Sequence, residues 1–139
     1  TILSGHLVSL VDDGGVQKFV LGVKKGELAY VAYQDETDED VVQAGVLTAY
    51  PVNDQYRFET PFFSGAIGTF TTGVPIIADL ANPGYLVVGT VGANNNVTAA
   101  ETVIGYVAKA AGYDVAPINS HVVNSNVITW DSDFVRASA

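Results

Sequence analysis

The densest group of chemically active side chains is the acidic run Asp35–Asp40, which reads DETDED and holds five carboxylates. Carboxylate oxygens are the ligands that Ca²⁺ prefers, but the run lacks the glycine and the distant bidentate glutamate of an EF-hand loop. Like charges repel one another and seek water, which favours a solvated loop tip. Contact with a basic partner is a third interpretation. The sequence leaves the three open.

Residues suited to proton transfer or nucleophilic attack are few. The two histidines, His6 and His121, lie far apart among small polar and apolar residues, which favours ordinary strand positions over a base or a metal ligand. Ser64 precedes a glycine but follows two phenylalanines, so the turn that exposes a catalytic serine is missing. We therefore predict that the protein is not an enzyme and that it needs no cofactor and no metal.

Composition excludes several classes of partner. The 139 residues carry a net charge of −9 with only six lysines and arginines, which argues against nucleic acid and against an anionic membrane surface. There is no cysteine, so disulfides and thiolate metal sites are excluded. Only 15% of the residues are charged, against a norm of about 25%, which indicates that much of the surface is either neutral or covered by a partner or by further copies of the chain.

The first residues carry no recognisable export or membrane segment. Ile2–Val11 is short and is interrupted by serine, glycine and histidine. We therefore expect synthesis in the cytoplasm without an export signal.

The stretch Gly84–Ala110 is expected to organise the fold. Two apolar runs rich in β-branched residues, Tyr85–Val91 and Thr102–Ala108, flank the polar tip Asn94–Asn96. Consecutive asparagines favour a turn because asparagine tolerates left-handed backbone. This pattern predicts a β-hairpin, around which the other strands are arranged.

Residues 98–112 also fit a helix. Thr98 would be the N-cap with Glu101 as its capping-box partner, and Gly112 would end the helix. Gly105 in the middle and the β-branched residues around it favour a strand instead.

The remaining chain predicts further strands and turns. An Asp-Gly signal at Asp12–Gly15 predicts a first hairpin. Val41–Gly45 fits either one helical turn, with Gly45 as its C-cap, or the entry to a strand. Asn82–Gly84 is a tight turn. The expected strands outside Gly84–Ala110 are Ser4–Leu10, Lys18–Val23, Leu28–Tyr33, Val46–Pro51, Gln55–Thr60, Val74–Leu80 (with Pro75 at an edge or first position) and Val127–Trp130.

Together these elements predict a mainly β fold: a single-domain antiparallel β-barrel or sandwich with at most one or two short helices and an extended C-terminal arm. Residues 1–112 would form the core domain. Residues 113–139 would supply a last strand and an arm packed on the core or on a neighbouring subunit, because Ser132–Ala139 shows no hydrophobic period.

Several segments together resemble a known class of protein. They are the opening Gly5–Val8 with its Asp-Gly turn, Gly45–Tyr50 in mid-chain, and Val103–Val107 before an Asn/Ser-rich tail. In these features Ser4–Ala110 resembles the small head proteins of tailed bacteriophages, in particular capsid decoration (cement) proteins. The resemblance is one of overall texture and carries no diagnostic motif.

The resemblance implies a structural virion protein on the outer capsid surface. Such proteins are β-rich, often trimeric, and clamp neighbouring major capsid subunits after the shell expands. The implied partners are the major capsid protein and the chain itself, as a homotrimer. A head-fibre or tail-associated module that binds a receptor or carbohydrate is the alternative, motivated by seven tyrosines and Asn-rich loops.

Aromatic residues are the candidates for an interface. Phe62, Phe63 and Phe70 lie in the aromatic-glycine segment Pro61–Gly73 and would either close one end of the barrel or anchor a subunit interface. The tail supplies the others. The full set of predicted interface residues is Phe62, Phe63, Phe70, Trp130, Phe134 and Arg136.

Overall fold

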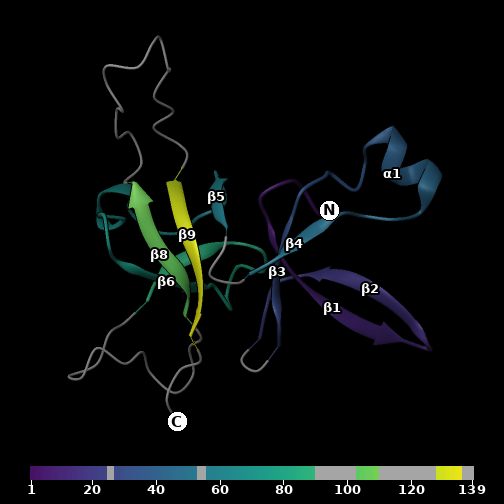
Figure 1. Cartoon of the computed structure of the whole chain (residues 1–139), viewed down its shortest axis with the longest axis horizontal. Coiled ribbons are helices and arrows are strands. Elements are labelled where there is room, and N and C mark those ends of the chain that lie inside the picture. Colours follow the sequence, from purple (N-terminus) through teal and green to yellow (C-terminus); the bar gives the residue numbers. More distant parts are fainter. Residues whose placement is uncertain (25–26, 53–55, 90–102, 110–127, 136–139) are drawn as a thin grey trace.

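The chain folds into two antiparallel sheets that lie side by side (Figure 1). The computed structural model describes residues 1–24, 27–52, 56–89, 103–109 and 128–135, with the backbone alone at 103, 109 and 132–135. The first sheet, in the order β2-β1-β3-β4, consists of β1 (Leu7–Asp13), β2 (Val16–Leu21), β3 (Ala29–Ala32) and β4 (Ala49–Pro51). The second, in the order β5-β9-β8-β6-β7, consists of β5 (Arg57–Thr60), β6 (Pro75–Ala78), β7 (Leu86–Val88), β8 (Val103–Lys109) and β9 (Ile128–Val135).

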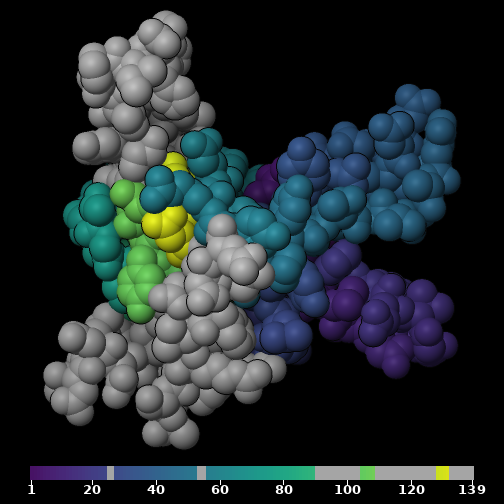
Figure 2. All heavy atoms as spheres, viewed as in Figure 1, coloured from purple at the N-terminus to yellow at the C-terminus, as the bar shows by residue number. Residues whose placement is uncertain are grey.

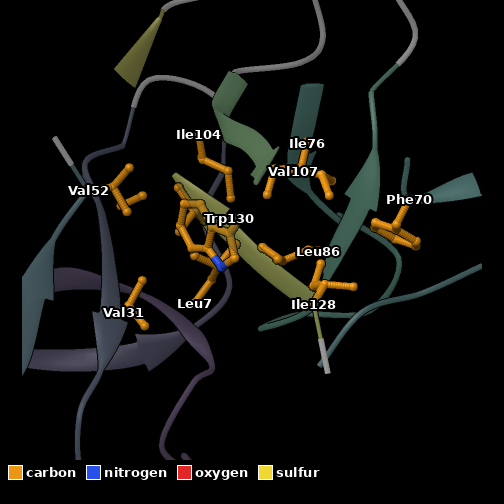
Figure 3. Packing of buried hydrophobic residues seen from close by; sticks show 12 residues of the cluster. Leu7, Val31, Val52, Phe70, Ile76, Leu86, Ile104, Val107, Ile128 and Trp130 are labelled. Atoms are coloured by element: carbon orange, nitrogen blue, oxygen red, sulfur yellow. The ribbon is translucent and has the colours of Figure 1, made fainter. Parts of the chain in front are cut away.

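The predicted mainly β fold is confirmed, but the sheets do not close into a barrel. They are joined by a shared core rather than by a common ladder. Leu7 and Val31 from the first sheet pack with Leu86, Ile128 and Trp130 from the second (Figure 3). Backbone bonds support the junction, because Leu7 N–H donates to the Gly84 carbonyl at 2.9 Å. The architecture therefore holds two sheets in a fixed relation through buried side chains.

The first hairpin confirms its prediction, with a shift in the turn. Asp13 pairs with Val16, so the two central residues are Gly14 and Gly15, at φ 63° and 87°. Positive φ at both positions is what a two-residue type I′ turn requires. Asp12 completes the turn because its carboxylate accepts a hydrogen bond from Gly15 N–H at 3.0 Å.

The helical interpretation of Val41–Gly45 is also confirmed. Helix α1 (Glu39–Ala44) ends at Gly45, whose φ of 69° is left-handed and whose N–H bonds to the Val41 carbonyl at 2.8 Å. Glu39 and Asp40 occupy its first turn, where negative charge suits the helix dipole. A second short element, the 3₁₀ turn η1 (Ile67–Thr69), lies in the aromatic-glycine segment.

The predicted hairpin at Gly84–Ala110 is wrong. Both of its strands exist, as β7 and β8, but β6 lies between them: Ile76 pairs with Val88 on one side and with Gly105 on the other. Hairpin loops span about two to five residues, so the longer connection between β7 and β8 leaves room for another strand to insert. The tip Asn94–Asn96 and the rest of residues 90–102 lie outside the described residues.

Residues 98–112 were compatible with either a strand or a helix, and the described part of this range is a strand. Residues 103–109 form a strand, and 98–102 and 110–112 lie outside the described range. Pro75 is the first residue of β6, as predicted, and Gly84 takes a φ of 94° in the Asn82–Gly84 turn. The strands expected on either side of residues 53–55 form as β4 and β5, but in different sheets.

The C-terminal strand corrects the expectation of an arm beginning at Ser132. Strand β9 continues to Val135 and lies between β5 and β8 in the second sheet. Strand β5 pairs with Ile128–Asp131, and β8 pairs with β9 as far as Val135, so backbone pairing to β8 continues the strand where the sequence lacks a hydrophobic period. Residues 136–139 lie outside the described range.

Candidate functional site

The structure removes two residues from the predicted interface set. Phe70 and Trp130 have 0% and 1% of their surface exposed and belong to the core, so neither can contact a partner while the domain is folded. Phe63 is half-buried and packs against Phe70 with ring centroids 5.0 Å apart. For Phe63 and Phe70 the structure supports the interpretation that they are core residues.

Of the other predicted interface residues, the structure describes the side chain of Phe62 but not those of Phe134 and Arg136. Phe62 is half-buried and lies against His6, with ring centroids 3.8 Å apart. Phe134 belongs to β9, but its side chain is outside the described part of the structure. Arg136 lies outside the described residues, and so does His121.

His6 is a buried structural residue at the junction of the sheets. It is 5% exposed, and its Nδ1 accepts a hydrogen bond from Leu3 N–H at 2.9 Å. Burial and the positive charge of the N-terminal amine lower the pKa of His6 below its ordinary value of 6.5, and the carboxylate of Asp35 opposes this in part. The ring is therefore neutral at pH 7, which agrees with Nδ1 acting as an acceptor.

This pKa shift predicts a dependence of stability on pH. Because the folded pKa of His6 lies below the unfolded one, the unfolded chain binds the proton more readily. The contribution of His6 is fully present above about pH 6.5 and is lost as the pH falls towards the folded pKa, with a slope of at most about 1.4 kcal/mol per pH unit. Denaturant unfolding from about pH 8 to pH 5, in an H121Q background, measures this slope.

The matched control for that experiment is His6→Asn in the same background. Asparagine keeps an acceptor for Leu3 N–H but does not titrate, so the shared carboxylate contributions cancel in the comparison. Equal slopes for the two proteins would contradict the assignment.

The acidic run Asp35–Asp40 has a local role that the sequence did not indicate. Asp35 Oδ1 accepts a hydrogen bond from Ser4 N–H, and Glu36 Oε1 accepts one from Ile2 N–H, both at 2.6 Å. These two carboxylates fasten the first residues of the chain to the segment between β3 and α1. Within the described residues, no three histidine, aspartate or glutamate side chains gather closely enough to hold a metal ion.

The feature best suited to contact another molecule is a groove between hairpin β1–β2 and α1. We call it the hairpin–helix groove, and its volume is about 490 Å³. Figure 2 shows it as an open hollow between the purple lobe of the hairpin and the blue lobe that carries α1. It is lined by Ile2, Leu10, Val16, Gln17, Lys18, Phe19, Glu36, Val41, Val42, Gly45, Val46 and Leu47.

Most of the residues that line the groove are apolar, and several of them are exposed. Val16 on the hairpin and Val42 and Val46 on the helix side are 63–67% exposed, and Leu10 is 37% exposed. Single exposed aliphatic residues are ordinary, whereas four of them around one groove make it a candidate interaction site. One wall is also acidic, because Glu36 lines the groove and Glu39 and Asp40 begin α1.

Local sequence explains both walls. Side chains alternate along paired strands, so Leu10 and its partner Phe19 face the groove while Ser9 and Val20 face away. In α1, Val41 turns inward and is buried, whereas Val42 is left exposed. The sequence did not predict the groove, because the groove depends on the distance between hairpin β1–β2 and α1 in the folded chain. The sequence signal that could have pointed to it is the pair Val42 and Val46, which follows the acidic run.

A row of tyrosines lies elsewhere, across the two sheets. Tyr33 and Tyr50 have ring centroids 5.3 Å apart, and Tyr50 and Tyr56 are 5.4 Å apart. Tyr33 and Tyr50 pack edge to face at 75°, and Tyr50 and Tyr56 are tilted by 42°, so the three rings do not form one flat platform.

No helix among the described residues is long and apolar enough to cross a membrane. Comparisons with protein-family models, with curated proteins and with solved structures found no match to this chain. The candidate site therefore rests on the geometry of the hairpin–helix groove.

Proposed function

We propose that this protein is a structural virion component that binds the outside of a phage capsid and stabilises it by bridging major capsid subunits. The observation that supports the proposal most is the hairpin–helix groove, where four aliphatic residues stay exposed between two projecting lobes. The resemblance of Ser4–Ala110 to capsid decoration proteins supplies the identity of the surface that it binds. The proposal includes self-association as a homotrimer.

The mechanism is a gain of buried surface that exists only in the assembled particle. Apolar surface removed from water contributes about 25 cal/mol per Å². Because the contact forms only on the assembled shell, binding stabilises that state by mass action. Such a role uses shape and apolar contact and needs no reactive group.

The negative charge of the chain indicates which side chains the bound capsid segment would carry. The chain has a net charge of −9, and one groove wall carries Glu36 with Glu39 and Asp40 close by. We propose that an apolar segment flanked by lysine or arginine fills the groove, since complementary charge favours encounter and fixes the register of a contact.

The test replaces the exposed valines. The double variant V42D/V46D is expected to bind shells that lack the protein at least about tenfold more weakly, because it places two carboxylates in an apolar contact. Its thermal unfolding should match the wild type, since both side chains are exposed. Co-sedimentation with shells of the phage that encodes the chain measures the binding.

Leu28→Asp is the matched control, because Leu28 is 58% exposed and does not line the groove. It should bind like the wild type. Equal binding by V42D/V46D would reject the groove as the contact, and failure of the wild type to bind any shell would reject the structural role itself.

The carbohydrate-binding alternative stays a prediction. The rings of Tyr33, Tyr50 and Tyr56 are mutually inclined, so a sugar ring would pack on the face of one tyrosine and not on all three together.

A further inference from the structure

A second concave site lies on the opposite face of hairpin β1–β2, which we call the Ser9 pocket. Its volume is about 150 Å³. It lies between the hairpin and the turn after β6, and its apolar walls come from Val11, Val20, Val23, Leu80 and Pro83. Successive side chains along a strand face opposite ways, so the pair Ser9–Val20 lines this pocket while the neighbouring pair Leu10–Phe19 lines the hairpin–helix groove.

Among the described residues, Ser9 is the one uncharged polar side chain in the lining of the pocket. Ser9 is 1% exposed, and its Oγ is buried without a hydrogen-bond partner. A buried hydroxyl left unpaired costs about 1–3 kcal/mol, so such groups are rare and call for an explanation. A ligand that offers a hydrogen bond to Ser9 Oγ would recover that cost on binding.

Three charged residues also line the pocket, and none of them forms a hydrogen bond with the Ser9 hydroxyl. Lys24 is exposed, and Glu27 and Asp79 are half-buried. Asp79 Oδ1 already accepts a hydrogen bond from Ala81 N–H at 3.0 Å. The aliphatic walls therefore select an uncharged ligand body, with its polar atom directed to Ser9.

We infer that the Ser9 pocket binds a phenol-type group, an aromatic ring with one hydroxyl, whose ring lies between the aliphatic walls and whose hydroxyl bonds to Ser9 Oγ. The size fits, because a volume of about 150 Å³ is enough to hold a benzene ring. The chemistry fits, because a phenolic hydroxyl both donates and accepts, as the serine hydroxyl does. The group is either a free small phenol or the tyrosine side chain of a partner.

The experiment uses the isolated full chain, so it does not depend on the proposed capsid role. Amide shifts in residues 20–23 and 80 are followed by NMR during titration with p-cresol and, separately, with toluene, which has the same ring without the hydroxyl. We expect p-cresol to bind at least about fivefold more tightly than toluene, the ratio that one recovered hydrogen bond gives.

The variant Ser9→Ala isolates the hydrogen bond. It should fold at least as stably as the wild type, because it removes an unpaired buried hydroxyl, and its preference for p-cresol should fall to about one. Ser4→Ala, outside the pocket, should keep the wild-type preference. Absence of p-cresol shifts in the wild type, equal affinity for p-cresol and toluene, or a preference that survives in Ser9→Ala would each overturn the inference.

A final arm separates the two sources of the ring. The capped tripeptide Gly-Tyr-Gly is compared with Gly-Phe-Gly under the same conditions. Binding of the tyrosine peptide alone supports the side chain of a partner, and binding of p-cresol without either peptide supports a free small phenol.

Discussion

Replacing Gly105 with alanine is expected to lower the free energy of unfolding by at least about 3 kcal/mol, at the upper end of what overpacking a core costs. Gly105 lies in β8, between β6 and β9. A Cβ there would collide with the carbonyl oxygen of Asp131 and would lie 2.6 Å from Cε3 of Trp130. The colliding oxygen belongs to the backbone of β9, which is paired on both edges and cannot move aside.

Gly68→Ala is the matched control for this substitution. Gly68 lies in η1, has no positive φ, and has no atom within 4 Å of the position where a Cβ would be. Its unfolding free energy should stay within about 0.5 kcal/mol of the wild type. Urea denaturation of both variants measures the difference. A Gly105→Ala protein that loses less than about 1 kcal/mol would mean that β8 and β9 do not approach as closely as described.

Gly105 also shows what kind of information the sequence lacks. In the sequence, this glycine argued for a strand only because glycine weakens a helix. In the structure, its role is to let a tryptophan and a neighbouring backbone approach closely, which no local pattern reveals. The local sequence was therefore enough to predict strand β8, whereas the need for glycine at position 105 comes from its tertiary contacts.

Turns and strands were predictable where their causes are local. Gly14, Gly45 and Gly84 take the positive φ values that their turns or caps require, and each was expected from neighbouring residues. The order of strands was not predictable in this way. The interposition of β6 between β7 and β8 depends on which apolar faces fit together, and the composition of each strand is compatible with several orders.

In the candidate sites, too, the residues are visible in the sequence but their surroundings follow only from the fold. Ser9 interrupts an apolar run in the sequence, so its presence is visible there, but its lack of a partner is a property of the folded chain. Val42 and Val46 follow an acidic run, and only the fold shows that they face a hairpin across a hollow.

The second large effect concerns Trp130, for which the sequence and the structure give opposite expectations. From the sequence, Trp130 is predicted to be an interface residue at the end of the strand Val127–Trp130 in the tail. The structure pairs Asp131 with Arg57 on the exposed side of β9, with Nε and Oδ1 2.6 Å apart, and directs Trp130 inward against Phe58. Alternation along the strand therefore separates the charged residue from the buried ring.

Trp130→Ala is accordingly expected to cost about 3–5 kcal/mol of unfolding free energy in the isolated chain, the range for deleting a buried tryptophan. Leu28→Ala, an exposed control, should change it by less than about 0.5 kcal/mol. Denaturant titration of the two variants distinguishes the alternatives, because an interface anchor contributes to binding and leaves the stability of the isolated domain unchanged. If Trp130→Ala unfolds like the wild type but no longer binds shells, the ring belongs to the interface and the core described for the second sheet is wrong.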